Sequence, residues 1–442
     1  MRRRLWSFRI PELFYYKEDS PEIAGEFYYA SHIRTLLELK ASASERIVRG
    51  SGPRQPEPGT ARVDTRQTRK ERGKAMNHEE YMRRAIDLAK KGEGHTNPNP
   101  LVGAVIVKDG KIIGEGYHEK YGELHAERNA LKYCTDDPKG ATMYVTLEPC
   151  CHHGKQPPCT EAIIEAGIAK VIVGSKDPNP LVAGKGVQQL RDAGIEVEVD
   201  FLREECDAIN DIFFHYIEKK RPLVALKYAM TADGKIAAAD GESQWITGEK
   251  ARAHVHRLRN RYAAILVGMG TVEKDNPMLT TRGMENPSHP LRIVLDTKGR
   301  ISEGCKLVQT AKEVPLWVAT CDMEPEKEKE LTKRGVNVQR LPQKNGKVSL
   351  MALLDKLYEA GVDSLLVEGG AEVNGSFLSE GLVDKVYVYI GGKLLGGDGK
   401  SPIGGTGLHL PDAVALRPTE ITSWDEDILI VYRREKACLQ EL

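Results

Sequence analysis

Three side chains that bind metals and one carboxylate form the most informative pattern in this chain. His125 is followed two residues later by Glu127, and Cys150 and Cys159 come downstream. One His and two Cys side chains fill the three protein positions of a catalytic zinc site and leave a fourth position for water. Glu127 then has a separate role, because a zinc deaminase needs a carboxylate that carries protons and does not bind the metal. The pattern predicts a zinc hydrolase that acts on an amino group.

Both groups of ligands are expected at the starts of helices. Residues Ala126–Leu131 have a helical pattern, and Pro157-Pro158-Cys159 precedes a second helical run, Thr160–Ala166. The free N–H groups and the dipole at a helix start favour anions, which lowers the pKa of a thiol there. We therefore expect the cysteines to bind zinc as thiolates.

Composition is that of an ordinary globular protein. The 442 residues are 40% hydrophobic and 29% charged, with a formal net charge of zero. This balance favours two or three domains and indicates neither nucleic acid nor a membrane as a partner. No apolar run approaches the roughly 20 residues that cross a bilayer. The eight cysteines are scattered, so we expect a protein of the reducing cytoplasm.

Residues 1–75 differ in composition from the rest of the chain. A stretch rich in Pro, Gly, Arg and Thr runs from Arg49 to Lys74, and we expect most of this segment to be disordered or non-native. Met76 precedes Asn77 and Glu80, which have the spacing of a helix capping box. We expect Met76 to be the native start, which N-terminal mass spectrometry of the natural protein would test.

Helical and strand-like runs alternate from Met76 to the end of the chain, and the alternation falls into two sets. Lys219-Lys220-Arg221-Pro222 separates the sets because proline disfavours helix at the preceding residue. We predict two α/β domains, residues 76–221 and 222–442, of which the first has an α/β/α layered sheet. In the first set the expected elements are a helix over His78–Lys91, strands over Leu101–Lys108, Lys111–Tyr117, Met143–Leu147, Lys170–Gly174 and Glu196–Val199, and a last helix over Glu204–Lys219. In the second set the expected strands are Leu223–Met230, Ala263–Val267, Leu291–Leu295, Leu316–Ala319, Ser364–Val367, Lys385–Ile390 and Ile428–Tyr432.

Two glycine loops follow strands in the second set. They are Gly268-Met269-Gly270-Thr271 and Glu368-Gly369-Gly370-Ala371. A helix that begins after such a loop offers free N–H groups to a phosphate. The Gly-x-Gly-x-x-Gly fingerprint of dinucleotide-binding domains does not occur, so the pattern leaves open whether a nucleotide binds here.

The spacing of the cysteines resembles one family of deaminases. Eight residues separate Cys150 from Cys159, whereas commoner nucleobase deaminases have Pro-Cys-x-x-Cys. From about Met76 to its end, the chain resembles the bifunctional deaminase/reductase family of riboflavin biosynthesis. The N-terminal strings that carry the resemblance are Asn97-Pro98-Asn99-Pro100-Leu101-Val102-Gly103, Thr146-Leu147-Glu148-Pro149-Cys150, His153-Gly154-Lys155, Pro157-Pro158-Cys159 and Asp177-Pro178-Asn179-Pro180. The C-terminal strings are Leu226-Lys227, Thr231-Ala232-Asp233-Gly234-Lys235, Ser243-Gln244-Trp245-Ile246-Thr247, Gly268-Met269-Gly270-Thr271-Val272, Asp275-Asn276-Pro277-Met278-Leu279-Thr280 and Val367-Glu368-Gly369-Gly370.

The resemblance implies a cytidine-deaminase-like domain followed by a dihydrofolate-reductase-like domain that uses NADPH. The implied NADPH contacts are Ala229, Trp245, Thr271, Asp275, Gly370, Ala371, Glu372, Val373, Asn374, Gly375 and Ser376. The implied contacts with the reductase substrate are Lys227, Ser243, Arg259, Leu279, Arg282 and Glu368. The implied contacts with the deaminase substrate are Asn99, His118, His152, Lys155 and Asp177.

Three assignments go with this resemblance. Cys151 stands where the family is expected to have Ser, which makes Cys150 and Cys151 adjacent candidates; we assign zinc to Cys150, which follows Glu-Pro as the family ligand does. Arg259 and Arg282 suit a phosphate because a guanidinium offers paired donors to its oxygens. Lys227 either orients the ribose or donates a proton.

The implied reaction sequence is deamination of a pyrimidine ribosylamine phosphate, then reduction of its ribosyl chain to ribityl by NADPH. The family also implies a homo-oligomer. One alternative is a deaminase of nucleotides or of tRNA adenosine, and the cysteine spacing and the reductase strings argue against it. Another is a nucleic-acid-binding or regulatory protein with structural zinc, which would have no need of Glu127.

Overall fold

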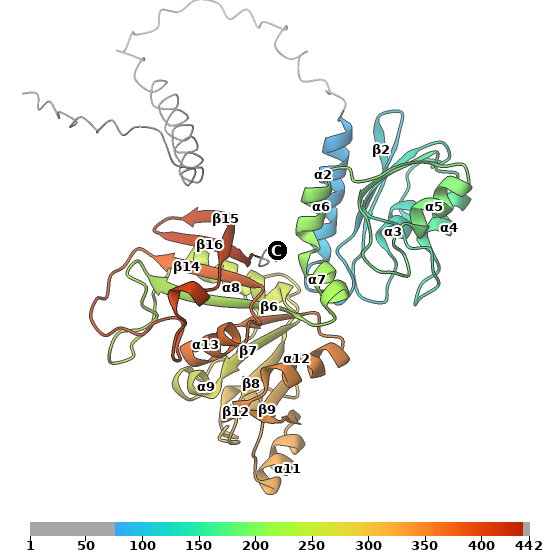
Figure 1. Ribbon diagram of the computed structural model, residues 1–442. Coiled ribbons are helices and arrows are strands. Elements are labelled where there is room, and N and C mark those ends of the chain that lie inside the picture. Colours follow the sequence, from blue (N-terminus) through green and yellow to red (C-terminus); the bar gives the residue numbers. More distant parts are fainter. Residues whose placement is uncertain (1–75, 436–442) are drawn as a thin grey trace, which may run out of the picture. The chain divides into compact units, whose positions relative to one another are not determined.

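The computed structural model of the chain describes residues 76–435 (Figure 1). The expectations for residues 1–75 lie outside the described residues. Within 76–435, every helix is too short or too polar to cross a lipid bilayer. The described chain forms two α/β halves, each built on its own sheet, as the alternation of elements predicted.

The N-terminal half, residues 76–221, is built on a five-stranded sheet with the order β2-β1-β3-β4-β5. β1 runs antiparallel to β2 and β3, whereas β3, β4 and β5 are parallel. Its strands are β1 (Gly103–Lys108), β2 (Lys111–Tyr117), β3 (Thr142–Leu147), β4 (Lys170–Ser175) and β5 (Glu196–Glu198). Its helices are α2 (His78–Ala89), α3 (Ala126–Lys132), α4 (Cys159–Glu165), α5 (Lys185–Asp192), α6 (Arg203–Ile209) and α7 (Asp211–Lys219), and a 3-10 turn, Lys90–Gly92, follows α2.

Both faces of this sheet are covered by helices. Ala104 and Ile106 of β1 share a core with α3, α4 and α5, whereas Val105 and Val107 share a core with α2 and α6. Alternate side chains of a strand point to opposite faces, so these two cores make the three-layer α/β/α arrangement that was predicted. Figure 1 shows α2 and α6 on one side of the sheet and α3, α4 and α5 on the other.

The helix boundaries differ from the prediction at one point. Glu204–Lys219 was expected as one helix, but the chain leaves helical geometry at Asn210, where φ is −112° and ψ is 20°. The side chain of Asn210 donates to the carbonyl of Leu101 and accepts from its N–H, both at 2.8 Å. The break therefore falls at the residue whose side chain bonds to a distant loop. The Asn77–Glu80 capping box at the start of α2 is present, as expected.

The C-terminal half, residues 222–435, is built on a nine-stranded sheet with the order β10-β9-β8-β7-β13-β6-β14-β16-β15. Neighbours from β10 to β14 are parallel, and β16 and β15 complete the sheet antiparallel. Its strands are β6 (Leu223–Thr231), β7 (Ala264–Gly268), β8 (Leu291–Leu295), β9 (Leu316–Thr320), β10 (Val336–Arg340), β13 (Ser364–Val367), β14 (Lys385–Gly391), β15 (Leu416–Trp424) and β16 (Asp427–Arg434). A separate two-stranded hairpin consists of β11 (Gln343–Lys344) and β12 (Lys347–Val348).

Helices also cover both faces of the larger sheet. α12 and α13 pack on one face, and α8 to α11 pack on the other. These helices are α8 (Glu249–Arg261), α9 (Met269–Asp275), α10 (Lys306–Gln309), α11 (Pro325–Lys333), α12 (Leu350–Glu359) and α13 (Ala371–Ser379), with a 3-10 turn at Leu410–Asp412. β10 and β15 were not among the expected strands. β15 is almost wholly exposed, so its sequence lacks the apolar alternation that marks a half-buried strand.

The two halves are joined by a short connection and by ion pairs. α7 ends at Lys219 and β6 begins at Leu223. Arg221, between them, donates to both carboxylate oxygens of Asp384 at 2.6 and 2.7 Å. Asp211 of α7 is 6% exposed and meets three cations of the C-terminal half, Arg261 at 2.7 Å, Lys385 at 2.9 Å and Arg433 at 2.8 Å.

Candidate functional site

The structure brings the three predicted metal ligands together. Nδ1 of His125 lies 3.5 Å from Sγ of Cys150 and 3.4 Å from Sγ of Cys159, and the three donor atoms all lie within 4.8 Å of one another. His125 is the N-cap of α3, Cys159 is the first residue of α4, and Cys150 follows β3. The adjacent Cys151 points elsewhere, with its Sγ 3.8 Å from the carbonyl of Leu181.

The charges in this group suit a divalent cation. Hydrogen bonds from Cys159 and from His125 lower the pKa of the Cys150 thiol to about 4. The same bond with Cys150, together with burial, raises the pKa of Cys159 well above its ordinary value. One thiolate is therefore already favoured, and a coordinated metal ion deprotonates the second thiol. One imidazole nitrogen and two sulfurs are donors that select zinc over magnesium or calcium.

Glu127 lies beside the metal group in the first turn of α3. Its side chain is 3% exposed. Burial raises the pKa of the Glu127 carboxyl, and the negative charge of Cys150 raises it further. Glu127 is therefore a carboxyl group that can hold a proton next to a metal site and that lies outside the ligand set.

Asn99 and His118 form a fixed pair next to the ligands. Nδ2 of Asn99 donates to Nε2 of His118 at 3.1 Å, and Nδ1 of His118 donates to the carbonyl of Leu124 at 3.1 Å. Burial lowers the pKa of His118, which favours the neutral ring that these bonds require. The His118 ring meets the ring of His125 edge to face, with centroids 5.3 Å apart.

The other three predicted substrate contacts lie on the loops around this site. Nζ of Lys155 lies 4.0 Å from the centre of the Tyr121 ring. Nδ1 of His152 is buried and has no hydrogen-bond partner among the described residues. Burial raises the pKa of Asp177 to about 6, although its carboxylate accepts from the N–H of Asn179.

Glu148 is a buried polar residue whose role was not predicted. In the sequence it was noted only as part of Thr146-Leu147-Glu148-Pro149-Cys150, one of the strings that carry the family resemblance. It is 3% exposed and accepts from the N–H groups of Asp177, Gly184 and Val187 at 3.4, 3.0 and 3.1 Å. It therefore holds the loop that carries Asp177 against the strand end that carries Cys150. Its position directly before Pro149 and Cys150 was the only available signal.

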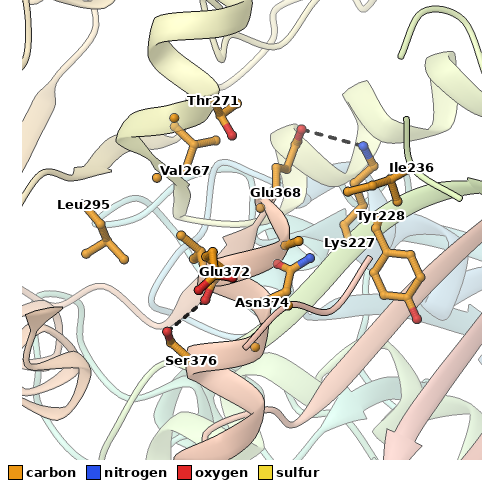
Figure 2. A pocket seen from close by; sticks show the side chains of 18 of the residues that line it. Lys227, Tyr228, Ile236, Val267, Thr271, Leu295, Glu368, Glu372, Asn374 and Ser376 are labelled. Atoms are coloured by element: carbon orange, nitrogen blue, oxygen red, sulfur yellow. Dashed lines mark hydrogen bonds and ion pairs between the residues drawn. The ribbon is translucent and has the colours of Figure 1, made fainter. Parts of the chain in front are cut away.

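The C-terminal half contains a cleft of about 2000 Å³ at the carboxyl ends of its parallel strands. Ligands bind at this edge in open α/β sheets. All the predicted NADPH and substrate contacts of this half line the cleft, and Figure 2 shows several of their side chains. They are Lys227, Ala229, Ser243, Trp245, Arg259, Thr271, Asp275, Leu279, Arg282, Glu368 and the loop from Gly370 through Ala371, Glu372, Val373, Asn374 and Gly375 to Ser376.

Glu368, at the end of β13, organises the charges in this cleft. Arg259 donates from Nε and Nη2 to its two carboxylate oxygens at 2.8 Å. Nζ of Lys227 lies 3.7 Å from the Glu368 carboxylate, and Figure 2 shows this pair. Burial alone would raise the pKa of Glu368, but Arg259 and Lys227 lower it to about 2. Burial also lowers the pKa of Lys227.

This arrangement changes the interpretation of the two arginines. The paired donors of Arg259, predicted to bind phosphate, are directed at Glu368. Arg282 also lines the cleft, and no ion pair involving it occurs among residues 76–435. Within the described residues, Arg282 is therefore a cation of the cleft whose guanidinium has no carboxylate partner.

The loop after β13 and an exposed tryptophan form a second region of the cleft. α13 begins directly after Gly370, so its first N–H groups face the cleft as a site for an anion. Trp245 is 60% exposed, and the guanidinium of Arg252 lies 4.6 Å from the centre of its ring. A diphosphate and a flat heterocycle are the chemical groups that such a region accommodates.

The cleft has further polar residues that the sequence interpretation missed. Thr297, Lys298 and Arg300 line it directly after β8. Their position after a parallel strand was a usable signal. His256 lines the cleft from α8, and its Nδ1 is buried without a partner among the described residues; no spacing in the sequence pointed to it.

Comparison with known proteins supports a zinc-binding deaminase half and a reductase half. The family model for the cytidine and deoxycytidylate deaminase zinc-binding region matches residues 75–175, and the model for the RibD C-terminal domain matches residues 222–430. The riboflavin biosynthesis protein RibD of Actinobacillus pleuropneumoniae is 56% identical over 361 residues, which are 81% of this chain and 96% of that protein. RibD of Escherichia coli is 40% identical over 368 residues, 80% of this chain and 99% of that protein.

Solved structures show the same relationship. A diaminohydroxyphosphoribosylaminopyrimidine deaminase/5-amino-6-(5-phosphoribosylamino)uracil reductase from Thermotoga maritima is 42% identical with a TM-score of 0.72, over 80% of this chain and 97% of that one. RibD of Acinetobacter baumannii is 37% identical with a TM-score of 0.73, over 80% of this chain and 98% of that one. With a zinc-binding deaminase half and a reductase half in one polypeptide, the chain belongs to the RibD family of bifunctional riboflavin-biosynthesis deaminase/reductases.

Proposed function

We propose that the chain deaminates 2,5-diamino-6-(5-phosphoribosylamino)pyrimidin-4(3H)-one and then reduces the ribosyl chain with NADPH to give 5-amino-6-(5-phosphoribitylamino)uracil. The main support for this proposal is that one chain contains two separate sites suited to the two reactions. These are the His125, Cys150 and Cys159 group with Glu127 beside it, and the charged cleft around Glu368. The division into a deaminase domain, residues 76–221, and a reductase domain, residues 222–442, is part of the proposal.

In the deaminase site, His125, Cys150 and Cys159 hold zinc. A zinc ion held by these three residues would supply a hydroxide nucleophile near neutral pH. The Glu127 carboxyl takes up a proton and delivers it to the leaving amino group, and its raised pKa suits a group that must hold that proton.

The loop residues around the zinc site bind the substrate. Asn99 and neutral His118, already paired, offer a fixed surface to the pyrimidine ring. Lys155 supplies a positive charge to the phosphate. His152 has a free ring nitrogen, and Asp177 has a carboxyl group whose pKa is close to neutral; both are placed to bond with polar groups of the substrate.

In the reductase site, NADPH supplies a hydride and the protein supplies position and charge. The N–H groups at the start of α13 would hold the diphosphate of NADPH, and Trp245 would offer its exposed ring to a flat part of the cofactor. Lys298 and Arg300, in the loop after β8, would favour the extra phosphate that distinguishes NADPH from NADH, although Arg300 also pairs with Glu273 at 3.0 Å. Ser243, Leu279 and Arg282 hold the sugar phosphate.

Lys227 has two open roles in the reductase, to orient the ribose or to donate a proton. It is paired with Glu368 inside the cleft. An ammonium whose pKa is lowered by burial releases a proton more readily than a solvated lysine. This supports proton donation to the sugar oxygen.

Product analysis by mass spectrometry tests both activities. Zinc-loaded full-length protein is incubated with the diaminopyrimidinone ribosylamine phosphate, without reductant, with NADPH, or with NADH. We expect deaminated product alone without reductant, and the ribityl product with NADPH at a kcat/KM well above that with NADH. Absence of deamination would refute the first activity, and deamination without reduction would refute the second.

We also propose a homo-oligomer in the cytoplasm. The strand β15 closes one edge of the larger sheet, and its Ile421 is 69% exposed. Such an edge offers unpaired N–H and C=O groups to another strand. No cysteine of the described chain forms a disulfide, in keeping with a reducing compartment.

A further inference from the structure

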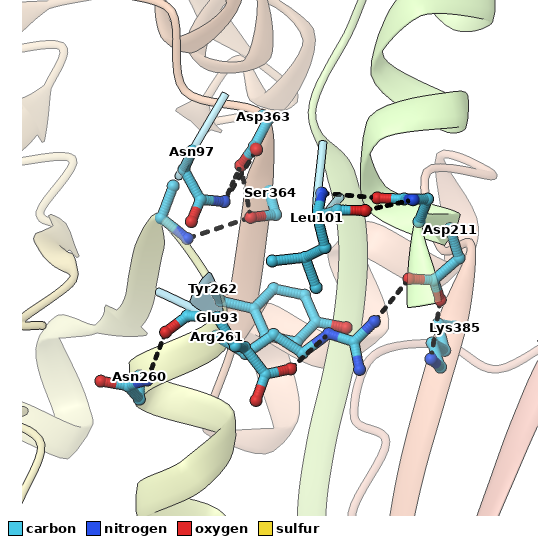
Figure 3. A network of polar contacts seen from close by, with 12 residues as sticks. Glu93, Asn97, Leu101, Asp211, Asn260, Arg261, Tyr262, Asp363, Ser364 and Lys385 are labelled. Carbon is cyan, nitrogen blue, oxygen red and sulfur yellow. Dashed lines mark hydrogen bonds and ion pairs between the residues drawn. The ribbon is translucent and has the colours of Figure 1, made fainter. Parts of the chain in front are cut away.

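One loop of the N-terminal half is held by side chains of the C-terminal half (Figure 3). Nδ2 of Asn97 donates to both carboxylate oxygens of Asp363, at 3.0 and 2.8 Å. Nδ2 of Asn260 donates to the carbonyl of Glu93 at 3.0 Å. Nε of Arg261 lies 3.5 Å from the carboxylate of Glu93. These contacts fix residues 93–97 from outside the half to which they belong.

The packing at this point leaves little room for movement. Gly94 has φ of 83°, a conformation that disfavours other residues, and an added Cβ would lie 2.4 Å from the carbonyl oxygen of Asn260. Asp363 is 2% exposed, and its Oδ1 also accepts from Oγ of Ser364 at 2.7 Å. The carboxylate that holds Asn97 is therefore itself fixed at the start of β13.

The same loop continues directly to the deaminase site. The N–H of Asn99 donates to the carbonyl of Thr96 at 2.8 Å. The side chain of Asn99 then bonds with His118, whose ring contacts the metal ligand His125. At its far end the loop is held at Leu101 by Asn210 of the N-terminal half. Within the segment before Asn99, the carbonyl of His95 accepts from the N–H of Tyr121 of the N-terminal half at 3.0 Å. Glu93 and Asn97, on either side of it, are held by the C-terminal half.

We propose that Asp363 and Asn260 of the reductase half are positioning residues for deamination, because they hold the loop that presents Asn99 to the substrate. This inference rests on the proposed deaminase function and on the placement of Asn99 in its substrate site. Deamination would therefore depend on contacts with the reductase half, although the residues proposed to touch its substrate belong to the N-terminal half.

An exchange of the two partners tests the proposal. Asn97→Asp places a second carboxylate against Asp363 and removes the donor. Adding Asp363→Asn restores an amide–carboxylate pair in the opposite direction, in which Nδ2 donates to residue 97 and Oδ1 still accepts from Ser364. Because a hydrogen bond to a charged group contributes about 1.5–3 kcal/mol, we expect Asn97→Asp to raise the KM for deamination about tenfold or more. We expect the double variant to return KM to near the wild-type value.

Three controls separate positioning from general damage. Zinc content and the kcat/KM for reduction of the deaminated intermediate are expected to stay at wild-type values in all variants. Arg221→Met, which removes the bonds to Asp384 near the junction of the halves and shares no partner with this loop, is expected to leave both activities unchanged. Circular dichroism of each variant checks that it folds.

The results that would refute the positioning role differ from the result that would refute the proposed deaminase function. A wild-type KM in Asn97→Asp, or no recovery in the double variant, would overturn the positioning role, as would an equal loss of reductase activity. A wild-type protein that reduces the deaminated intermediate but deaminates nothing would instead refute the proposed function.

Discussion

At the scale of single residues, the two sites differ in how much of their chemistry the sequence revealed. The cluster of His125, Cys150 and Cys159, with Glu127 beside it, could be predicted because these residue types and this spacing are specific to one kind of site. The ion pair of Arg259 with Glu368 was not predicted, since it joins α8 to the end of β13 across 109 positions of sequence. A guanidinium taken alone indicated a phosphate, and only the fold shows that its partner is a carboxylate of the same chain.

The role of Glu127 is tested by Glu127→Gln, which keeps the shape of the side chain and removes the proton carrier. General acid–base catalysis contributes about 10²–10⁴-fold to rate, and we expect kcat for deamination to fall by that order. Zinc content and NADPH-dependent reduction are expected to remain unchanged. Measured zinc loss in this variant would point to a ligand role instead.

The lowered pKa of Lys227 predicts how reductase activity depends on pH. Because burial lowers its pKa from the ordinary value of 10.5, the ammonium loses its proton below pH 10.5. We expect reductase kcat/KM to decline on the alkaline side as this proton is lost. Lys227→Arg, whose guanidinium stays charged to pH above about 12, is expected to lower activity and to remove this decline. The same alkaline decline in the variant would assign it to another group.

At the scale of secondary-structure elements, the sequence predicted the strands of both cores well, because the strand runs are apolar and bounded by turns. It was less successful where an element depends on a distant partner. The helix expected over Glu204–Lys219 breaks at Asn210, whose side chain bonds to Leu101. β15 carries few buried side chains and pairs only with β16, so no local pattern marks it.

The packing of α3 on β2 predicts the effect of one added methyl group. A Cβ at Gly116 would lie 2.2 Å from the backbone nitrogen of Ala130 and 2.5 Å from the carbonyl oxygen of Ala126. Both atoms belong to α3, which has His125 at its N-cap and Glu127 in its first turn. Gly116→Ala must therefore displace the helix, and we expect a loss of about 1–3 kcal/mol in the free energy of unfolding together with lower zinc affinity.

Urea unfolding and a zinc competition titration measure the two effects. Gly110→Ala is the matched control because an added Cβ there meets no atom within 4 Å, although its φ of 74° adds some backbone strain. That control should lose stability without losing zinc affinity. Unchanged zinc affinity in Gly116→Ala would mean that α3 does not set the ligand geometry.

At the scale of the whole molecule, the sequence indicated two α/β halves and a division near Pro222, but not the contacts that join them. Asp211 and its three cations are separated by between 50 and 222 positions. Each is individually an ordinary charged residue, and no local spacing relates them. Only the packing of α7 against the C-terminal half brings them together.

The lowered pKa of Asp211 predicts how the stability of the two joined halves depends on pH. Burial alone would raise its pKa, but Arg261, Lys385 and Arg433 together hold it well below the ordinary value of 3.8. A lowered carboxylate pKa stabilises the folded state above that ordinary value, and this contribution is lost as pH falls toward the folded-state pKa. Asp211→Asn leaves three cations without their partner, and we expect it to cost about 3 kcal/mol of unfolding free energy at pH 7.

Urea unfolding of wild type and Asp211→Asn at pH 7 and at pH 3 tests this expectation. The difference in unfolding free energy between wild type and Asp211→Asn should be smaller at pH 3. At that pH the stabilisation that comes from the ionised Asp211 begins to be lost. A difference that is the same at both values of pH would show that packing, rather than charge, accounts for the effect.

The short junction between α7 and β6 has a consequence for metabolism. Only Lys220, Arg221 and Pro222 lie between the two elements, and Arg221 is fixed by Asp384. Every translated chain therefore delivers one deaminase centre and one reductase centre, and changes in gene expression cannot alter their ratio. The steady-state amount of the deaminated intermediate in a cell then depends on the relative catalytic efficiencies of the two centres, so natural selection can adjust it only through amino-acid changes in this one protein.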